Sequence, residues 1–175
     1  MKEKMDLVFY GDDILRKKAD PVEKISPEIK SFVSDMFEML YKSEGVGLAA
    51  PQVGSSSAIV VIDPSVGENP SAKIALINPE IIEKKGEQYE EEGCLSFPGI
   101  SARVSRPTFV KVRYMNLDGE VVEREIQGLL ARVYDHEIDH LNGVLFVDHI
   151  KGLEKQLLMR KIKKTMISES WNKAS

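Results

Sequence analysis

Hydrophobic positions change their spacing twice along the chain, and these changes divide it into predicted helices and strands. Ser26-Pro27-Glu28 has the residues of a helix start, because a hydroxyl N-cap is followed by a proline and an acid suited to the first turn. The apolar residues that follow recur at helical spacing as far as Tyr41. The pattern therefore predicts a helix that ends near Gly45.

The middle of the chain has the shorter period of β-strands. Residues 58–62 and 74–77 are apolar runs bounded by Gly, Pro and Asn, which is typical of buried strands. Residues 109–114 and 121–126 alternate apolar and charged side chains. The sequence NLDG at 116–119 separates them, so these two segments are predicted to form a hairpin.

Helical spacing returns at residues 129–141, which end at an Asn-Gly pair, and a last helix is predicted over residues 153–171. This order lacks regular β–α–β alternation and indicates an α+β fold with mainly antiparallel sheet. We expect the sheets to pack around the 129–141 helix, with another helix at the C-terminal end. No repeat or linker interrupts the chain, so residues 1–175 are expected to form a single domain.

Length and composition narrow the class of protein. A chain of 175 residues with 42% hydrophobic and 30% charged side chains is typical of a globular domain with its own core. We expect neither a signal peptide nor a membrane span, because no apolar run approaches the ~18 residues that a span needs. The single cysteine, Cys94, excludes an internal disulfide and favours a cytosolic setting.

Charge is unevenly distributed. The formal net charge of -4 gives no reason to expect binding to DNA. Residues 151–164, however, carry six basic side chains against Glu154, a local charge of +5 that leaves -9 for the rest of the chain. We interpret this stretch in the first place as a solvated face of the last helix.

Two of the three histidines stand in the motif His136-Glu137-Ile138-Asp139-His140. Residues four apart on a helix share one face, with Cβ atoms about 5–6 Å apart, so two imidazoles can bind one ion. Glu137 lies roughly 100° further around the helix, beside the ion but turned away from it, which suits a base acting on water. Without a metal, Glu137 would be a buried carboxylate with no stated partner, which is unfavourable.

The other side chains of this helix are arranged consistently with that interpretation. Four apolar residues form a band for the core: Leu130, Tyr134, Ile138 and Leu141. Leu129 and Val133 precede the histidines on the metal-facing side, where they could line a substrate pocket. Arg132 could reach the rim of that pocket or pair with Asp135 or Asp139.

A catalytic site of this type needs a third protein ligand and an open position. Cys94 lies on a segment typical of a strand end, although a lone cysteine is more often a small buried hydrophobe. Its flanks change that judgement. Three stretches together resemble the peptide deformylase family: GVGLAAPQ at 45–52, EGCLS at 92–96 and HEIDHL at 136–141. Weaker similarity, in GDDILR and GVLF, extends the resemblance from about residue 11 to residue 150.

The resemblance implies an α+β hydrolase that removes the N-formyl group from the N-terminal methionine of newly synthesised polypeptides and releases formate. It implies that Cys94 is the third ligand beside His136 and His140. Ferrous iron is the implied native metal, with Zn²⁺, Ni²⁺ or Co²⁺ as substitutes in preparations. The expected location is the cytoplasm of a bacterium or an organelle.

Roles for further residues follow from the same resemblance. Glu137 is expected to move protons, while the Gln52 side-chain amide and the Leu95 backbone N–H stabilise the oxyanion. Residues 45–48 are expected to bind an extended peptide through their backbone. The substrate-binding residues are therefore expected to be Val46, Gly47, Glu92, Leu129 and Val133.

One position departs from the family pattern. The residue before the first metal histidine is usually Gln, and here it is Asp135. On the helical wheel Asp135 points away from the metal, so we expect the ligand set to survive while the hydrogen bonding behind it changes. The resemblance also suggests a second interpretation of the basic stretch, in which it docks the enzyme on ribosomal RNA.

Two alternatives from other classes remain open on the sequence. A general zinc endopeptidase shares the H-E-x-x-H motif but cleaves internal peptide bonds. A metal-stabilised interaction protein without catalysis would need a fourth ligand, and His149 is the only further histidine.

Overall fold

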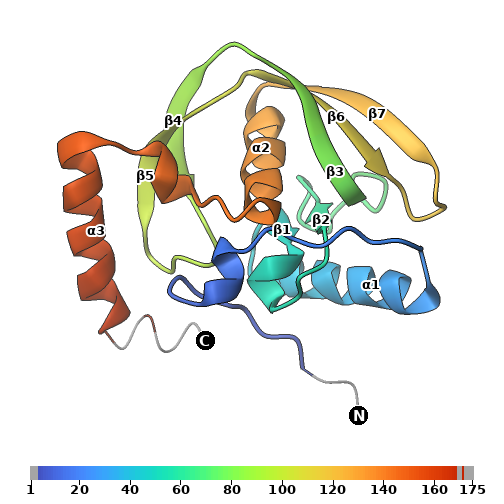
Figure 1. Ribbon diagram of the computed structural model, residues 1–175, viewed down its shortest axis with the longest axis horizontal. Helices are drawn as coiled ribbons and strands as arrows, with labels where there is room; N and C mark the ends of the chain where they lie inside the picture. Colours follow the sequence, from blue (N-terminus) through green and yellow to red (C-terminus); the bar gives the residue numbers. More distant parts are fainter. Residues whose placement is uncertain (1–3, 169–170, 172–175) are drawn as a thin grey trace.

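The computed structural model describes residues 4–168 and 171 of the chain (Figure 1). Three α-helices lie in this part: α1 (Pro27–Lys42), α2 (Leu129–Leu141) and α3 (Gly152–Met166). The strands are β1 (Gly47–Ala49), β2 (Ile59–Ile62), β3 (Ile74–Lys85), β4 (Gln88–Gly93), β5 (Ser101–Arg106), β6 (Phe109–Met115) and β7 (Val121–Gln127). Short 3₁₀ helices are η1 (Asp13–Arg16), η2 (Ala50–Val53) and η3 (Phe146–His149).

The strands form two antiparallel sheets. One has five strands in the order β1-β2-β3-β6-β7, and the other consists of β4 and β5. The predicted hairpin is confirmed, since β6 pairs with β7 from Phe109 opposite Gln127 to Met115 opposite Val121. The turn between them is closed by the Asn116 N–H, which donates to the Glu120 carbonyl at 2.9 Å.

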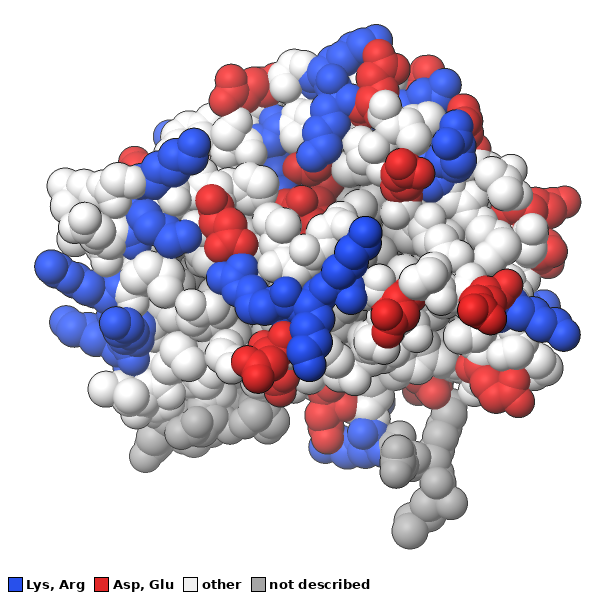
Figure 2. All heavy atoms as spheres, in the orientation of Figure 1, with Lys and Arg blue, Asp and Glu red and all other residues white. Residues whose placement is uncertain are grey.

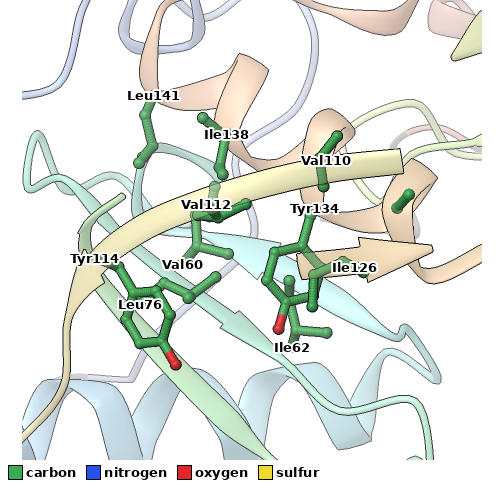
Figure 3. Packing of buried hydrophobic residues seen from close by; sticks show 12 residues of the cluster. Val60, Ile62, Leu76, Val110, Val112, Tyr114, Ile126, Tyr134, Ile138 and Leu141 are labelled. Atoms are coloured by element: carbon green, nitrogen blue, oxygen red, sulfur yellow. The ribbon is translucent and has the colours of Figure 1, made fainter. Parts of the chain in front are cut away.

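Helix α2 lies between the two sheets (Figure 1). Its apolar band packs against β2, β3, β6 and β7, as predicted, and Figure 3 shows Tyr134, Ile138 and Leu141 directed toward the strand residues of this core. Burial of this band holds the helix in place from one side. The opposite side of α2, which carries the histidines, faces β4 and the segment after it.

Helix α1 begins as the sequence predicts. The Ser26 hydroxyl accepts from the Ile29 N–H at 3.2 Å, and Pro27 occupies the first turn. The helix buries Val33 and Leu40 in a second core against β1 and β2. Because this core packs against one face of β1, it holds the short strand in place at the edge of the five-stranded sheet.

The last helix is shorter than predicted, ending at Met166 instead of Trp171. Its stripe of buried residues runs out after Ile162, and Ile167 is 86% exposed. The Ser168 N–H and hydroxyl both bond to the Thr165 carbonyl and close the final turn. Residues 169–170 of the predicted helix lie outside the described residues.

The β4–β5 pair was not predicted, because its strands read as polar. Only one face of this sheet packs inward, and charged side chains such as Glu91 and Arg103 stand opposite each other.

In the described part of the chain, no helix combines the length and apolar character needed to cross a membrane.

Candidate active site

A cavity of about 1020 Å³ opens between β1, β4 and α2. The predicted substrate-binding residues all line it: Val46, Gly47, Glu92, Leu129 and Val133. Leu129 is 73% exposed and therefore stands at the mouth. Phe97 and Ile100, which follow the cysteine segment, add apolar wall that the sequence analysis missed. The segment that contains them has no clear helical or strand periodicity, so only the folded structure shows that they line the cavity.

Cys94, His136 and His140 converge beside this cavity, with one ligand atom of each within 4.8 Å of the others. Cys94 Sγ lies 3.4 Å from His140 Nε2, and the two Nε2 atoms are 3.2 Å apart. Ligands of a tetrahedral ion at the usual Zn–N and Zn–S bond lengths are roughly 3.3–3.6 Å apart. These three residues therefore fit a divalent metal ion.

Glu92 holds the first histidine from behind. Its Oε1 lies 2.6 Å from His136 Nδ1, so that nitrogen donates and Nε2 keeps its lone pair for the metal. Burial alone would raise the pKa of Glu92, but hydrogen bonds from His136 and Arg106 lower it to about 2. The carboxylate is therefore ionised, and its oxygens are bound by His136, Arg106 and Arg132.

Glu137 lies next to the ligand atoms without joining them. It is 5% exposed, and its Oε1 is 4.0 Å from His136 Nε2. Among the described residues, its buried Oε2 is one of the few side-chain oxygens with no hydrogen-bond partner. Burial raises the pKa of the Glu137 carboxyl to about 7, which suits a group that exchanges protons near neutrality.

Gln52 is brought to the cysteine by η2. Its Oε1 accepts from the Ala49 N–H at 2.9 Å, which turns the amide nitrogen toward Cys94 Sγ at 3.5 Å and the Ser96 hydroxyl at 3.3 Å. The side chain is 1% exposed. A donor is thus held beside the proposed ligand set, whereas Leu95 lines the cavity itself.

Arg106, which the sequence analysis did not single out, connects the groups behind the histidines. It is fully buried and donates to Glu92, Asp135 and Asp139. His149 lies with Asp139 at 2.7 Å, so this histidine is engaged away from the ligand cluster. No strand was predicted at residues 101–106, so nothing in the sequence distinguished Arg106 from a surface residue.

The sequence left two places open for Arg132, the rim of the pocket or a pair with Asp135 or Asp139, and the structure places it in the lining of the cavity. It donates to Glu92 at 2.9 Å and to the carbonyls of Gln88, Glu90 and Val104, so it pairs with neither Asp135 nor Asp139. The β4–β5 sheet supplies all four acceptors. Arg132 therefore binds α2 to this sheet.

Comparison with known proteins agrees with this geometry. Residues 4–156 match the family described as polypeptide deformylase. The chain belongs to the peptide deformylase family. As a member of it, the chain is a hydrolase that removes the N-formyl group from newly synthesised polypeptides.

Individual relatives cover nearly the whole chain. A peptide deformylase of Acidobacterium capsulatum is 50% identical over 165 residues, 94% of this chain and 97% of that protein. The crystal structure of a peptide deformylase from Legionella pneumophila is similar with a TM-score of 0.85 and 41% identity, covering 91% of this chain and 94% of that one. A deformylase from Synechococcus elongatus, in complex with actinonin, has a TM-score of 0.88 at 37% identity, covering 96% and 91%. The family and its α+β fold with a C-terminal helix are thereby confirmed.

Proposed function

We propose that Cys94, His136 and His140 hold one divalent metal ion and that Glu137 moves the protons of deformylation. The observation that carries this is the placement of a buried carboxyl, Oε1 4.0 Å from His136 Nε2, beside three convergent ligand atoms. When bound, the ion supplies Lewis acidity that polarises the formyl carbonyl and lowers the pKa of water. We propose that the 175 residues act as one catalytic unit.

Glu137 takes a proton from the attacking water, whose oxygen forms a bond to the formyl carbon. The carbon–nitrogen bond then breaks, and Glu137 returns the proton to the departing amine. Formate and a free N-terminal methionine result. Burial raises the pKa of the Glu137 carboxyl, which suits a group that first accepts the proton and then returns it.

The oxyanion that develops on the formyl group needs donors that are already in position. Gln52 is suited to this role, because its carbonyl is bound to Ala49 N–H and its amide nitrogen is left on the side of Cys94. We assign the second donor to the Leu95 backbone N–H, in the turn where the Phe97 N–H bonds to the Cys94 carbonyl.

Strand β1 is an edge of the five-stranded sheet, paired on one side only, with β2. Its other side borders the cavity, so we propose that the nascent peptide adds there as an extended strand. The methionine side chain would lie against Val46, Leu129 and Val133. We place the enzyme in the cytoplasm of a bacterium or in an organelle.

The test is hydrolysis of formyl-Met-Ala peptide beside its unformylated and N-acetylated counterparts. We expect release of formate from the first and no cleavage of the other two. Cleavage of internal peptide bonds at a comparable rate would instead support the endopeptidase. Wild-type protein that binds no metal would refute the proposed site.

We propose Fe²⁺ as the working ion. Cys94 is half-buried in the cavity wall, where a thiolate beside ferrous iron is open to oxidation. Enzyme prepared without oxygen and loaded with Fe²⁺ is expected to be highly active and to decay in air, whereas a Ni²⁺ form resists decay and a Zn²⁺ form is stable but slow. Equal initial rates with Zn²⁺ and Fe²⁺, without oxygen sensitivity, would contradict the assignment.

The basic side chains of α3 support a further proposal, docking near the ribosomal tunnel exit. Arg160, Lys161, Lys163 and Lys164 are exposed, and Figure 2 shows Lys and Arg side chains at the edge of the molecule where α3 lies. Deleting α3 would also remove core residues, so charge reversal is the cleaner test. Lys163→Glu with Lys164→Glu is expected to weaken ribosome co-sedimentation and its salt dependence. Reversal of the exposed Lys17 and Lys18 is the control, and equal effects would refute the proposal.

A further inference from the structure

Behind the proposed metal site, Arg106 from the two-stranded sheet is joined by a charged side chain from the five-stranded sheet, Lys84. Lys84 on β3 places its Nζ 2.6 Å from Asp135 Oδ1, an ion pair without the angles of a hydrogen bond, while Asp135 Oδ2 accepts from Arg106 at 2.9 Å. The Asp135 side chain is 3% exposed and that of Lys84 51% exposed. Asp135 directly precedes His136, so the contact joins β3 to the helix that carries two of the ligands.

An irregularity in β3 directs Lys84 to this place. Ile81 stands opposite Val112, whereas Lys84 stands opposite Val110, with a register shift between Ile81 and Glu83. Val110 and Val112 both point into the core beneath α2. The extra residue in β3 therefore puts Lys84 on the α2-facing side, where strict alternation from Ile81 would have turned it outward.

Arg106 transmits the effect of this pair to the ligand. Its Nη1 donates to Asp135 and Asp139, and its Nε and Nη2 donate to Glu92. Glu92 in turn accepts from His136 Nδ1 at 2.6 Å. The guanidinium is planar and rigid, so a shift of the carboxylates on one edge changes the hydrogen bonds on the other.

Lys84 adds a positive charge to a cluster rich in carboxylates, in which His149 also contacts Asp139 at 2.7 Å. Three carboxylates, those of Glu92, Asp135 and Asp139, share the buried guanidinium groups of Arg106 and Arg132. Lys84 brings the third positive charge. Asp135 already shares one nitrogen of Arg106 with Asp139, so without Lys84 that shared donor would be its only cationic partner. A buried charge left short of partners is strongly destabilising.

We propose that Lys84 and Asp135 are a positioning pair that orients Arg106, and through it Glu92 and His136, for metal binding. This rests on the metal site of the proposed function. Neither residue lines the substrate cavity, so the pair acts on the ligand set and leaves substrate contacts alone.

The test compares Lys84→Met with Lys85→Met, the same change at the next residue of β3. Lys85 pairs with the exposed Glu83 at 2.8 Å and lies over the Phe109 ring, outside the cluster. Affinity for Co²⁺ is measured by competition with a chelator, and KM on a formyl-Met peptide is measured with the metal-loaded protein. Lys84→Met is expected to lower Co²⁺ affinity about tenfold, at the lower end of what partners of ligands contribute, with KM unchanged. The control is expected to match the wild type.

Combining Lys84→Met with Asp135→Asn removes both charges and is expected to recover most of the lost affinity. A role of Lys84 in the strand alone predicts no such recovery. If the single variant does not fold, recovery of folding and of Co²⁺ binding in the double variant supports the pair, and failure of both overturns it. Wild-type affinity in Lys84→Met also overturns it, whereas absence of Co²⁺ binding by the wild type would refute the metal site itself.

Discussion

Substituting Gly47 with alanine tests the position of Glu137 without touching Glu137 itself. A Cβ at Gly47 would lie 2.8 Å from Glu137 Cγ, 2.9 Å from Oε1 and 3.0 Å from Cδ. The φ angle of Gly47 is not positive, so alanine introduces no backbone strain at this position. The predicted effect is therefore steric contact with Glu137, the residue proposed to move protons.

The magnitude follows from these distances. Ordinary contact begins at 3.4 Å, so the nearest pair must separate by about 0.6 Å. The clash includes Cγ, so rotating the carboxyl group cannot relieve it. A displacement of about 1 Å in a catalytic group can cost roughly a hundredfold in rate, which places the expected loss of kcat near tenfold. Overpacking is expected to lower the free energy of unfolding by about 1–3 kcal/mol.

The assay is kcat on a formyl-Met peptide, with metal content and urea unfolding measured on the same samples. Gly47→Ala is expected to keep its metal, because it touches no ligand. Glu137→Ala removes the clashing atoms, so Gly47→Ala should destabilise that background much less than the wild type. Wild-type kcat in Gly47→Ala, or equal destabilisation in both backgrounds, would refute the reasoning.

Glu137→Ala is expected to keep one metal ion per chain and lose nearly all turnover, and metal content falling together with activity would contradict its role. His136→Ala or His140→Ala is expected to lose both, as measured by elemental analysis and formate release. Tyr41→Phe tests a charge remote from the site. Burial would raise the pKa of Asp63, but hydrogen bonds from Ser65 and from the Tyr41 hydroxyl, at 2.7 Å, hold it below its ordinary value. The hydrogen bond from Tyr41 to the Asp63 carboxylate stabilises the fold above about pH 4, and this stabilisation is lost as pH falls through the lowered pKa of Asp63. The free energy of unfolding of Tyr41→Phe is therefore expected to be about 1–3 kcal/mol below that of the wild type at pH 7, and the difference should shrink in acid. An equal difference at pH 7 and pH 3 would contradict this account.

Elements that depend on near neighbours were predicted well from the sequence. The cap at Ser26, the β6–β7 hairpin and the bounds of α2 each rest on residues a few positions apart. The two histidines and Glu137 belong to this class, because helical spacing alone places the two imidazoles on one face of α2 with Glu137 beside them. Cys94 required the family resemblance, since nothing local distinguishes a ligand from a small buried side chain.

The tertiary structure alone decided the contacts between segments that are distant in sequence. Arg106 meets Glu92 and Asp139 only because the β4–β5 sheet packs against α2, and the partners of Arg132 come from the same packing. The bulge in β3 brings Lys84 to Asp135 against the alternation that the sequence suggests. Periodicity records which face of an element is apolar, whereas the pairing of buried charges depends on which faces meet and in what register. The ligand set therefore follows from local spacing and family pattern, and the hydrogen bonds that hold it follow from the packing of the two sheets around one helix.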